Sequence, residues 1–212
     1  MKRLYFSFLI MLGWVVTGPC LSAQKVDSLI IVLERADSLY NAGNLEQALT
    51  DYDKVEVHYA GDNRIMRTLT ILSGGLCYYG LGERDTAEYV LNEGVERYSA
   101  LVQEKPEIRD GLLMSPYYRT LGVINLENKK YLEANGFFRK ALEENIRKYG
   151  DSHPEVAGSY YDLALFQFVM GKSISANAYL HEALKIYQVS GEGYMGNINQ
   201  IQALLQKTES VQ

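Results

Sequence analysis

One pair of small residues, twelve positions apart, occurs four times in this chain of 212 residues. Small residues let two helix backbones approach closely, and large apolar residues at spacings of three and four fill the remaining gap. A hairpin built in this way cannot bury its apolar face alone, so neighbouring hairpins must stack. The spacing therefore predicts four stacked helical hairpins. The four pairs are Ala36 and Ala48, Gly75 and Ala87, Gly122 and Ala134, and Ala164 and Ala176.

The turn of each predicted hairpin can also be located in the sequence. Seven residues after the first small residue of each pair stands Gly43, Gly82, Lys129 or Gly171. Glycine suits the left-handed conformation in which many helices end. We therefore expect the first helix of each hairpin to end at these positions.

This pattern resembles the tetratricopeptide repeat. The third unit, Tyr117–Leu142, fits the family's signature places best, and the resemblance covers about Asp27 to Gln188. The first small residues of successive pairs lie 39, 47 and 42 positions apart, whereas the family's minimal unit is about 34 residues. Together with the "GDSHPEVA" junction, this length is similar to the kinesin-light-chain variety of the repeat. The third unit's signature residues are Tyr118, Leu121, Gly122, Tyr131, Ala134, Phe138 and Ala141.

The resemblance implies an all-α, right-handed superhelical solenoid of about four repeats and a C-terminal capping helix. We expect a leader at 1–23, a repeat domain at 24–208 and a short tail at 209–212. The expected repeats are about 29–62, 68–101, 115–148 and 157–190, followed by a capping helix at about 194–208. The expected helices of the hairpins are 26–42, 44–60, 63–81, 83–103, 108–128, 130–149, 154–171 and 173–189.

The N-terminus has the three-part layout of a secretory signal peptide. Lys2 and Arg3 precede an uncharged apolar run, Leu4–Val16, which is followed by helix breakers and the small residues that end at Ala23. The run is shorter than the roughly 20 residues that span a bilayer. We expect cleavage after Ala23 and a protein exported to the periplasm or the exterior of a bacterial cell, with no membrane-spanning segment left after cleavage.

Two alternatives to a cleaved leader stay open. An uncleaved signal anchor is the first. The second is a lipoprotein modified at Cys20, against which Pro19 argues, because a lipoprotein signal has a small residue immediately before the modified cysteine.

The charge of the chain limits the class of partner. Its formal net charge is −5, and removal of the leader would take away two basic residues and make it more acidic. A nucleic-acid partner requires a basic face, and anionic lipid requires a polybasic patch. Cys77 is the only cysteine outside the leader, so no internal disulfide is expected, and its apolar surroundings predict a buried thiol. We expect a protein or peptide partner and no nucleic acid.

One cluster has the residue types of an active site. Asp151, His153 and Glu155 alternate within five residues, and they could serve as catalytic groups or ligate a divalent ion. A metal site would require at least one more convergent ligand. Pro154 favours a helix start, Ser152 or Asp151 could cap it, and Glu155 suits its positive end. We therefore expect a helix junction, with no catalytic site, metal or cofactor, and keep an enzyme as the remote alternative.

The first helices of such hairpins line a concave face, and the resemblance marks this face as the usual peptide-binding surface. Tyrosine, with 17 of the 212 residues, supplies both packing and contact surface. We expect a non-catalytic interaction scaffold that binds a peptide or partner helix in this groove. The alternative is a glycan-binding or accessory component of a cell-surface complex. The candidate contact residues are Tyr40, Asn41, Leu72, Tyr79, Arg119, Leu126, Glu127, Tyr161, Leu165 and Phe168.

Overall fold

Antiparallel helix pairs joined by short turns make up this protein. The computed structural model describes residues 23–58 and 63–209, and every regular element within these ranges is a helix. Cys20 and Pro19 lie outside the described residues, and the predicted cleavage site between Ala23 and Gln24 falls at the start of the first described helix. The chain divides into two compact units, Met1–Leu112 and Leu113–Gln212, and each unit has buried apolar clusters of its own.

The described residues of the first unit form two hairpins and one short helix. Helices α2 (Ala23–Asn41) and α3 (Leu45–His58) form the first hairpin, and α4 (Arg64–Leu81) and α5 (Arg84–Glu104) form the second. Helix α3 also packs on α4, which stacks the two hairpins. The single turn α6 (Ile108–Gly111) follows α5.

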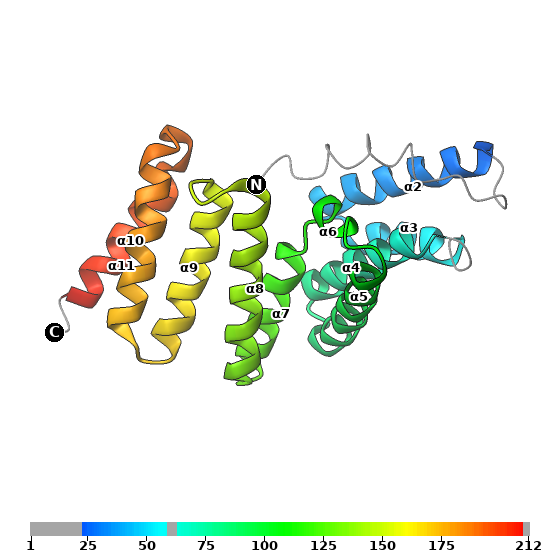
Figure 1. Ribbon diagram of the computed structural model, residues 1–212. Helices are drawn as coiled ribbons and strands as arrows, with labels where there is room; N and C mark the ends of the chain where they lie inside the picture. The colour runs from blue at the N-terminus through cyan, green and yellow to red at the C-terminus, as the bar shows by residue number, and fades with distance from the viewer. Residues whose placement is uncertain (1–22, 59–62, 210–212) are drawn as a thin grey trace. The chain divides into compact units, whose positions relative to one another are not determined.

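The second unit repeats this arrangement and ends with a further helix. Its hairpins are α7 (Ser115–Glu127) with α8 (Tyr131–Tyr149), and α9 (Pro154–Val169) with α10 (Ser173–Val189). Figure 1 shows α7 to α10 side by side with alternating direction. After the 3-10 turn η1 (Glu192–Tyr194), helix α11 (Met195–Glu209) packs on α10. The predicted all-α fold of stacked hairpins with a C-terminal capping helix is confirmed.

One predicted helix, 108–128, is wrong. The chain forms α6 and α7 instead, and Leu112 between them has an extended backbone. Pro116 explains the break, because proline lacks an N–H and its ring clashes with the preceding turn of a helix. It stands in the first turn of α7, where neither problem arises. The bounds of the other helices agree with the predictions to within three residues.

All eight small residues of the four pairs are buried. The two glycines show how closely the paired helices approach. A Cβ atom built on Gly75 would lie 2.7 Å from Cδ2 of Leu91, and one built on Gly122 would lie 2.8 Å from Cδ1 of Phe138. Even one methyl group does not fit at either position unless the facing side chain shifts.

The four hairpin turns share one left-handed residue, as the sequence predicts. Gly43, Gly82 and Gly171 have φ values of 81°, 88° and 69°. Lys129 occupies the same place in the third hairpin with a φ of 59°, and among the described residues it alone has a positive φ without being glycine. Local steric strain is therefore expected at this lysine.

Replacing Lys129 with glycine should raise the free energy of unfolding by about 0.5–1 kcal/mol. Relief of left-handed strain contributes about 1–2 kcal/mol, and the added freedom of the unfolded chain offsets about 0.4–1 kcal/mol of it. Urea unfolding of both proteins measures the difference. Lys172→Gly is the matched control, because Lys172 follows the turn glycine of the next hairpin with an ordinary φ of −99°. It should not stabilise the protein, and an equal gain in both variants would contradict the assignment of strain to Lys129.

Candidate functional site

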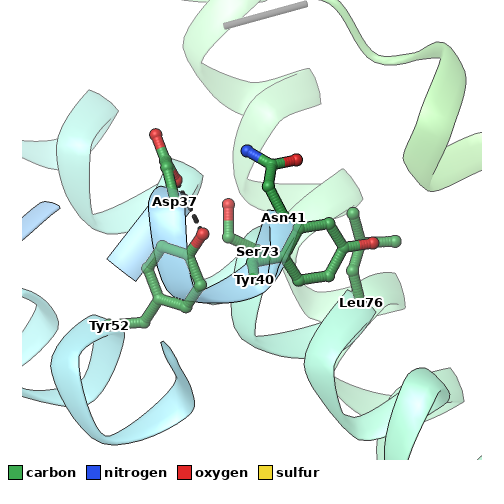
Figure 2. Close-up of a pocket in the computed structure, with 6 residues that line it drawn as sticks. All are labelled: Asp37, Tyr40, Asn41, Tyr52, Ser73 and Leu76. Carbon is green, nitrogen blue, oxygen red and sulfur yellow. Dashed lines mark hydrogen bonds between the residues drawn. The ribbon is translucent and has the colours of Figure 1, made fainter. Parts of the chain in front are cut away.

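A small pocket opens on the first unit. It has a volume of about 10 Å³ and lies where α2 and α4, the first helices of the two hairpins, approach each other. Figure 2 shows the side chains around it, three from α2, one from α3 and two from α4. The lining residues are Asp37, Tyr40, Asn41, Tyr52, Ser73 and Leu76.

Helix periodicity explains why these side chains meet. Residues three and four apart lie on one face of a helix, so Asp37, Tyr40 and Asn41 share a face of α2. Ser73 and Leu76 share a face of α4 in the same way. The floor is apolar, because the cluster beneath contains Ala36, Ala48, Tyr52 and Cys77.

Asp37 is the ionisable group of the pocket. The hydroxyl of Tyr52 donates a hydrogen bond of 2.6 Å to Oδ1 of Asp37, drawn as a dashed line in Figure 2. Burial raises the pKa of Asp37 above its ordinary value, the bond from Tyr52 partly opposes this rise, and the nearby charge of Glu34 adds to it. In the described part of the chain, no cationic side chain forms an ion pair with Asp37.

The groups beneath and beside Asp37 add no positive charge. The thiol of Cys77 is buried, and burial together with the charges of Asp37 and Asp53 raises its pKa to about 12. Burial also raises the pKa of Tyr40. Both groups are therefore neutral at physiological pH, which leaves the Asp37 carboxylate as the dominant charge of the pocket.

A second patch lies on the first helices of the second unit. Arg119 of α7 forms a two-pronged ion pair with Asp162 of α9, in which Nη2 and Oδ1 are 3.0 Å apart and Nε contacts Oδ2. The Arg119 side chain is 59 % exposed, whereas that of Asp162 is 11 % exposed. The pair links the two hairpins at their surface. Leu165, one turn after Asp162 on α9, is exposed.

Other predicted contact residues of the second unit are partly covered. Tyr161 and Phe168 pack against a core cluster that includes Ile201 and Leu205 of α11. Leu126 packs between the two hairpins, and Glu127 is exposed at the end of α7. The capping helix thus takes up part of the predicted contact surface.

Leu72 was predicted to contact a partner, and this prediction is wrong. Its side chain is fully buried, and it fills the space opposite Gly94 of α5, where a Cβ atom would lie 2.5 Å from Cδ2 of Leu72. Tyr79, by contrast, is half-buried, with the guanidinium of Arg84 over its ring at 4.1 Å from the centroid. Arg84 thus packs where the repeat pattern has a large apolar residue.

Sequence reasoning missed three polar groups at these sites. Tyr52 comes from a second helix, four residues after Ala48, where a large packing residue is expected and a functional hydroxyl is not. Ser73 was not chosen as a contact residue because its neighbour Leu72 was assigned to the exposed face instead. Asp162 could have been found from the sequence, because it is an acidic residue on the next hairpin after Arg119 and could therefore pair with it.

The Asp151–Glu155 cluster forms a helix junction. His153 is the N-cap of α9, because its Nδ1 accepts a hydrogen bond of 3.3 Å from the backbone N–H of Glu155. The expected cap at Ser152 or Asp151 is therefore wrong. The imidazole also stacks on Tyr149 at a centroid distance of 4.4 Å. Across 23–58 and 63–209, no three His, Cys, Asp or Glu residues are grouped so that they could hold a metal ion.

Comparison with known proteins supports this geometry. The sequence model of the tetratricopeptide repeat family matches residues 117–155, which cover the third hairpin from Tyr117 onward. This part of the chain is therefore similar to the tetratricopeptide repeat. No curated protein matches the chain. In the ranges that the structure describes, no helix is both long enough and apolar enough to cross a bilayer.

Solved structures share the fold at low sequence identity. BtubC (BKLC) from P. vanneervenii is 19% identical with a TM-score of 0.70, over 88% of this chain and 72% of that chain. Nearly identical TPR-like repeats of Podospora anserina, assigned to a kinesin light chain, are 16% identical with a TM-score of 0.65, over 86% of each chain. MamA is 19% identical with a TM-score of 0.51, over 82% of this chain and 92% of that one. At this level of identity, these likenesses show a shared tetratricopeptide-like fold.

Proposed function

We propose that this protein is a non-catalytic scaffold of the bacterial cell envelope, and that it binds a peptide or a partner helix along the first helices of its hairpins. The observation that carries this proposal is the surface of these helices. In the first unit they hold an open pocket with an unneutralised carboxylate. In the second they present the exposed Arg119, which is paired with Asp162, and the exposed Leu165 one turn after Asp162 on α9. Charged and apolar groups side by side suit a peptide that needs both contacts.

A protein ligand is favoured over a glycan. Sugar binding by such a scaffold would call for an exposed, planar aromatic pair flanked by carboxylates. The stacked pairs Tyr160–Tyr179 and Tyr187–Tyr194 contain only half-buried or buried rings that pack against the core of the second unit. Their surface is used for folding, which leaves little planar face for a sugar.

The envelope location rests on the leader sequence alone. Recovery of the protein from the envelope fraction of its host with Gln24 as its first residue would support the proposal. Recovery of the full-length chain from the cytoplasmic fraction would contradict it.

Crosslinking in the host cell, followed by mass spectrometry, tests partner binding. We expect Leu165→Glu to reduce the amount of crosslinked partner by about tenfold or more, because it places a charge in an apolar contact on the first-helix face. Leu132→Glu is the control, since Leu132 is 86 % exposed on α8, a second helix. Equal capture by both variants would contradict the use of this face. Thermal unfolding should show that both variants fold, as both replaced side chains are exposed.

A further inference from the structure

Asp37 differs from the other carboxylates of its unit that have a structural role. Asp51 is paired with Arg35 through bonds of 2.6 and 2.8 Å and with Lys54 at 2.8 Å. Glu104 is paired with Arg64 at 2.7 Å. Asp37 is half-buried, and its carboxylate is bound only to the Tyr52 hydroxyl. The neighbouring charge that affects its pKa is that of Glu34, which is also negative. The pocket therefore holds a negative charge that the described residues do not neutralise.

The size of the pocket restricts what could supply the missing positive charge. A volume of about 10 Å³ corresponds to about one water-sized group. An ammonium group has this size. The guanidinium of arginine is a plane of four heavy atoms and is too large to enter without rearrangement of the pocket.

The polar groups around the space match the three N–H donors of an ammonium. Asp37, Asn41 and Ser73 line one pocket and carry a carboxylate, an amide and a hydroxyl group, each of which has an oxygen that can accept a hydrogen bond. Tyr40 and Leu76 present apolar surface beside them, which suits the methylene stem of a lysine. We propose that this pocket binds the ammonium group of a lysine side chain on a protein partner. The inference rests on the proposed function, because it names one contact of the partner peptide.

The energetics of Asp37 agree with a role in binding. Its pKa is raised in the folded protein, so the native state holds this proton more tightly than the unfolded state does. Folding stability from this group is therefore highest below the unfolded pKa and declines as pH rises through the folded pKa. Of the other titratable groups, the charge of Glu34 on α2 raises the pKa of Asp37, and the hydrogen bond from Tyr52 on α3 lowers it. The thiol of Cys77 on α4 stays neutral.

A bound ammonium would reverse this effect, because it favours the ionised carboxylate. Lysine binding should thus strengthen as pH rises through the raised pKa of Asp37 and then level off. Asp37→Asn keeps an acceptor for the Tyr52 hydroxyl and removes the charge. We expect this variant to be at least as stable as the native protein at neutral pH, so it should fold.

The test selects random peptides displayed on phage against the full chain. We expect the selected peptides to share one lysine. The affinity of Asp37→Asn for these peptides should be lower by about tenfold or more, because the variant loses a charge-assisted hydrogen bond to a buried partner. Asp53→Asn, with the same charge change at an exposed acid of α3 outside the pocket lining, should bind them as the native protein does. Changing the shared lysine to arginine should also weaken binding.

The outcomes separate this inference from the proposed function. Selected peptides without a shared lysine, or with equal affinity for the native protein and Asp37→Asn, overturn the ammonium pocket and leave the scaffold intact. Equal binding of lysine and arginine peptides overturns the size argument and with it the proposal. Failure to select any peptide overturns both. As an independent probe, Nα-acetyl-lysine methylamide should shift the amide resonances around Asp37 in NMR spectra, and Nα-acetyl-norleucine methylamide should not. Equal shifts with both probes count against the pocket.

Discussion

Gly122→Trp should lower the free energy of unfolding by about 3–5 kcal/mol, among the largest effects of a single substitution. Gly122 lies on α7 where it meets α8, and a Cβ atom there would already be 2.8 Å from Cδ1 and Cε1 of Phe138. Phe138 is 3 % exposed and packs in the cluster that joins the two hairpins of this unit, so its ring cannot swing into solvent. Overpacking of such a site forces backbone shifts and strained rotamers. Urea unfolding followed by circular dichroism measures the loss.

Gly136→Trp is the matched control for this prediction. Gly136 is a helical glycine of α8 in the same hairpin, and a Cβ atom there would meet nothing within 4 Å. Replacing it should change stability little or raise it slightly, because glycine weakens a helix interior by about 1 kcal/mol relative to alanine. An unchanged unfolding midpoint in Gly122→Trp, or equal losses in both variants, would contradict the close approach of the two helices at Gly122.

The fold could be predicted from the sequence because close helix packing restricts single positions to small residues. Gly75 and Gly122 have no room for a methyl group, and Ala48 and Ala87 are fully buried. The turn glycines are similarly restricted by backbone conformation. Lys129 shows that the constraint lies in the position rather than in the residue, since it adopts the left-handed conformation without being glycine.

The break between α6 and α7 is a case where periodicity misled the prediction. An apolar pattern continues through 108–128, but Pro116 and the extended Leu112 interrupt the helix. Local chain chemistry outweighed the hydrophobic period here, because a proline in a helix interior costs about 3 kcal/mol.

The candidate site was less predictable than the fold, because it depends on rotation of a helix by a single residue. Leu72 and Ser73 are adjacent, yet Leu72 is fully buried against Gly94 and Ser73 lines the pocket. Successive residues of a helix point about 100° apart, so an error of one position exchanges core for surface. The hydroxyl of Tyr52 reaches Asp37 from another helix, and that contact follows from packing rather than from any sequence motif.

Ala164→Asp should lower the free energy of unfolding by about 3–5 kcal/mol at neutral pH, because it buries a carboxylate without a partner. Ala164 is fully buried in the cluster that joins α9, α10 and α11, with Val156, Leu180 and Ile201 among its members. Val169→Asp, at a 60 % exposed position of the same helix, should cost less than about 1 kcal/mol. The introduced carboxyl should have a raised pKa in the folded state, so the deficit of Ala164→Asp should shrink as pH falls towards 4, whereas that of Val169→Asp should not. Denaturant unfolding of both variants at pH 4 and pH 7 measures this difference. A deficit of Ala164→Asp that is independent of pH would mean that the loss comes from steric strain and that the carboxyl has reached solvent.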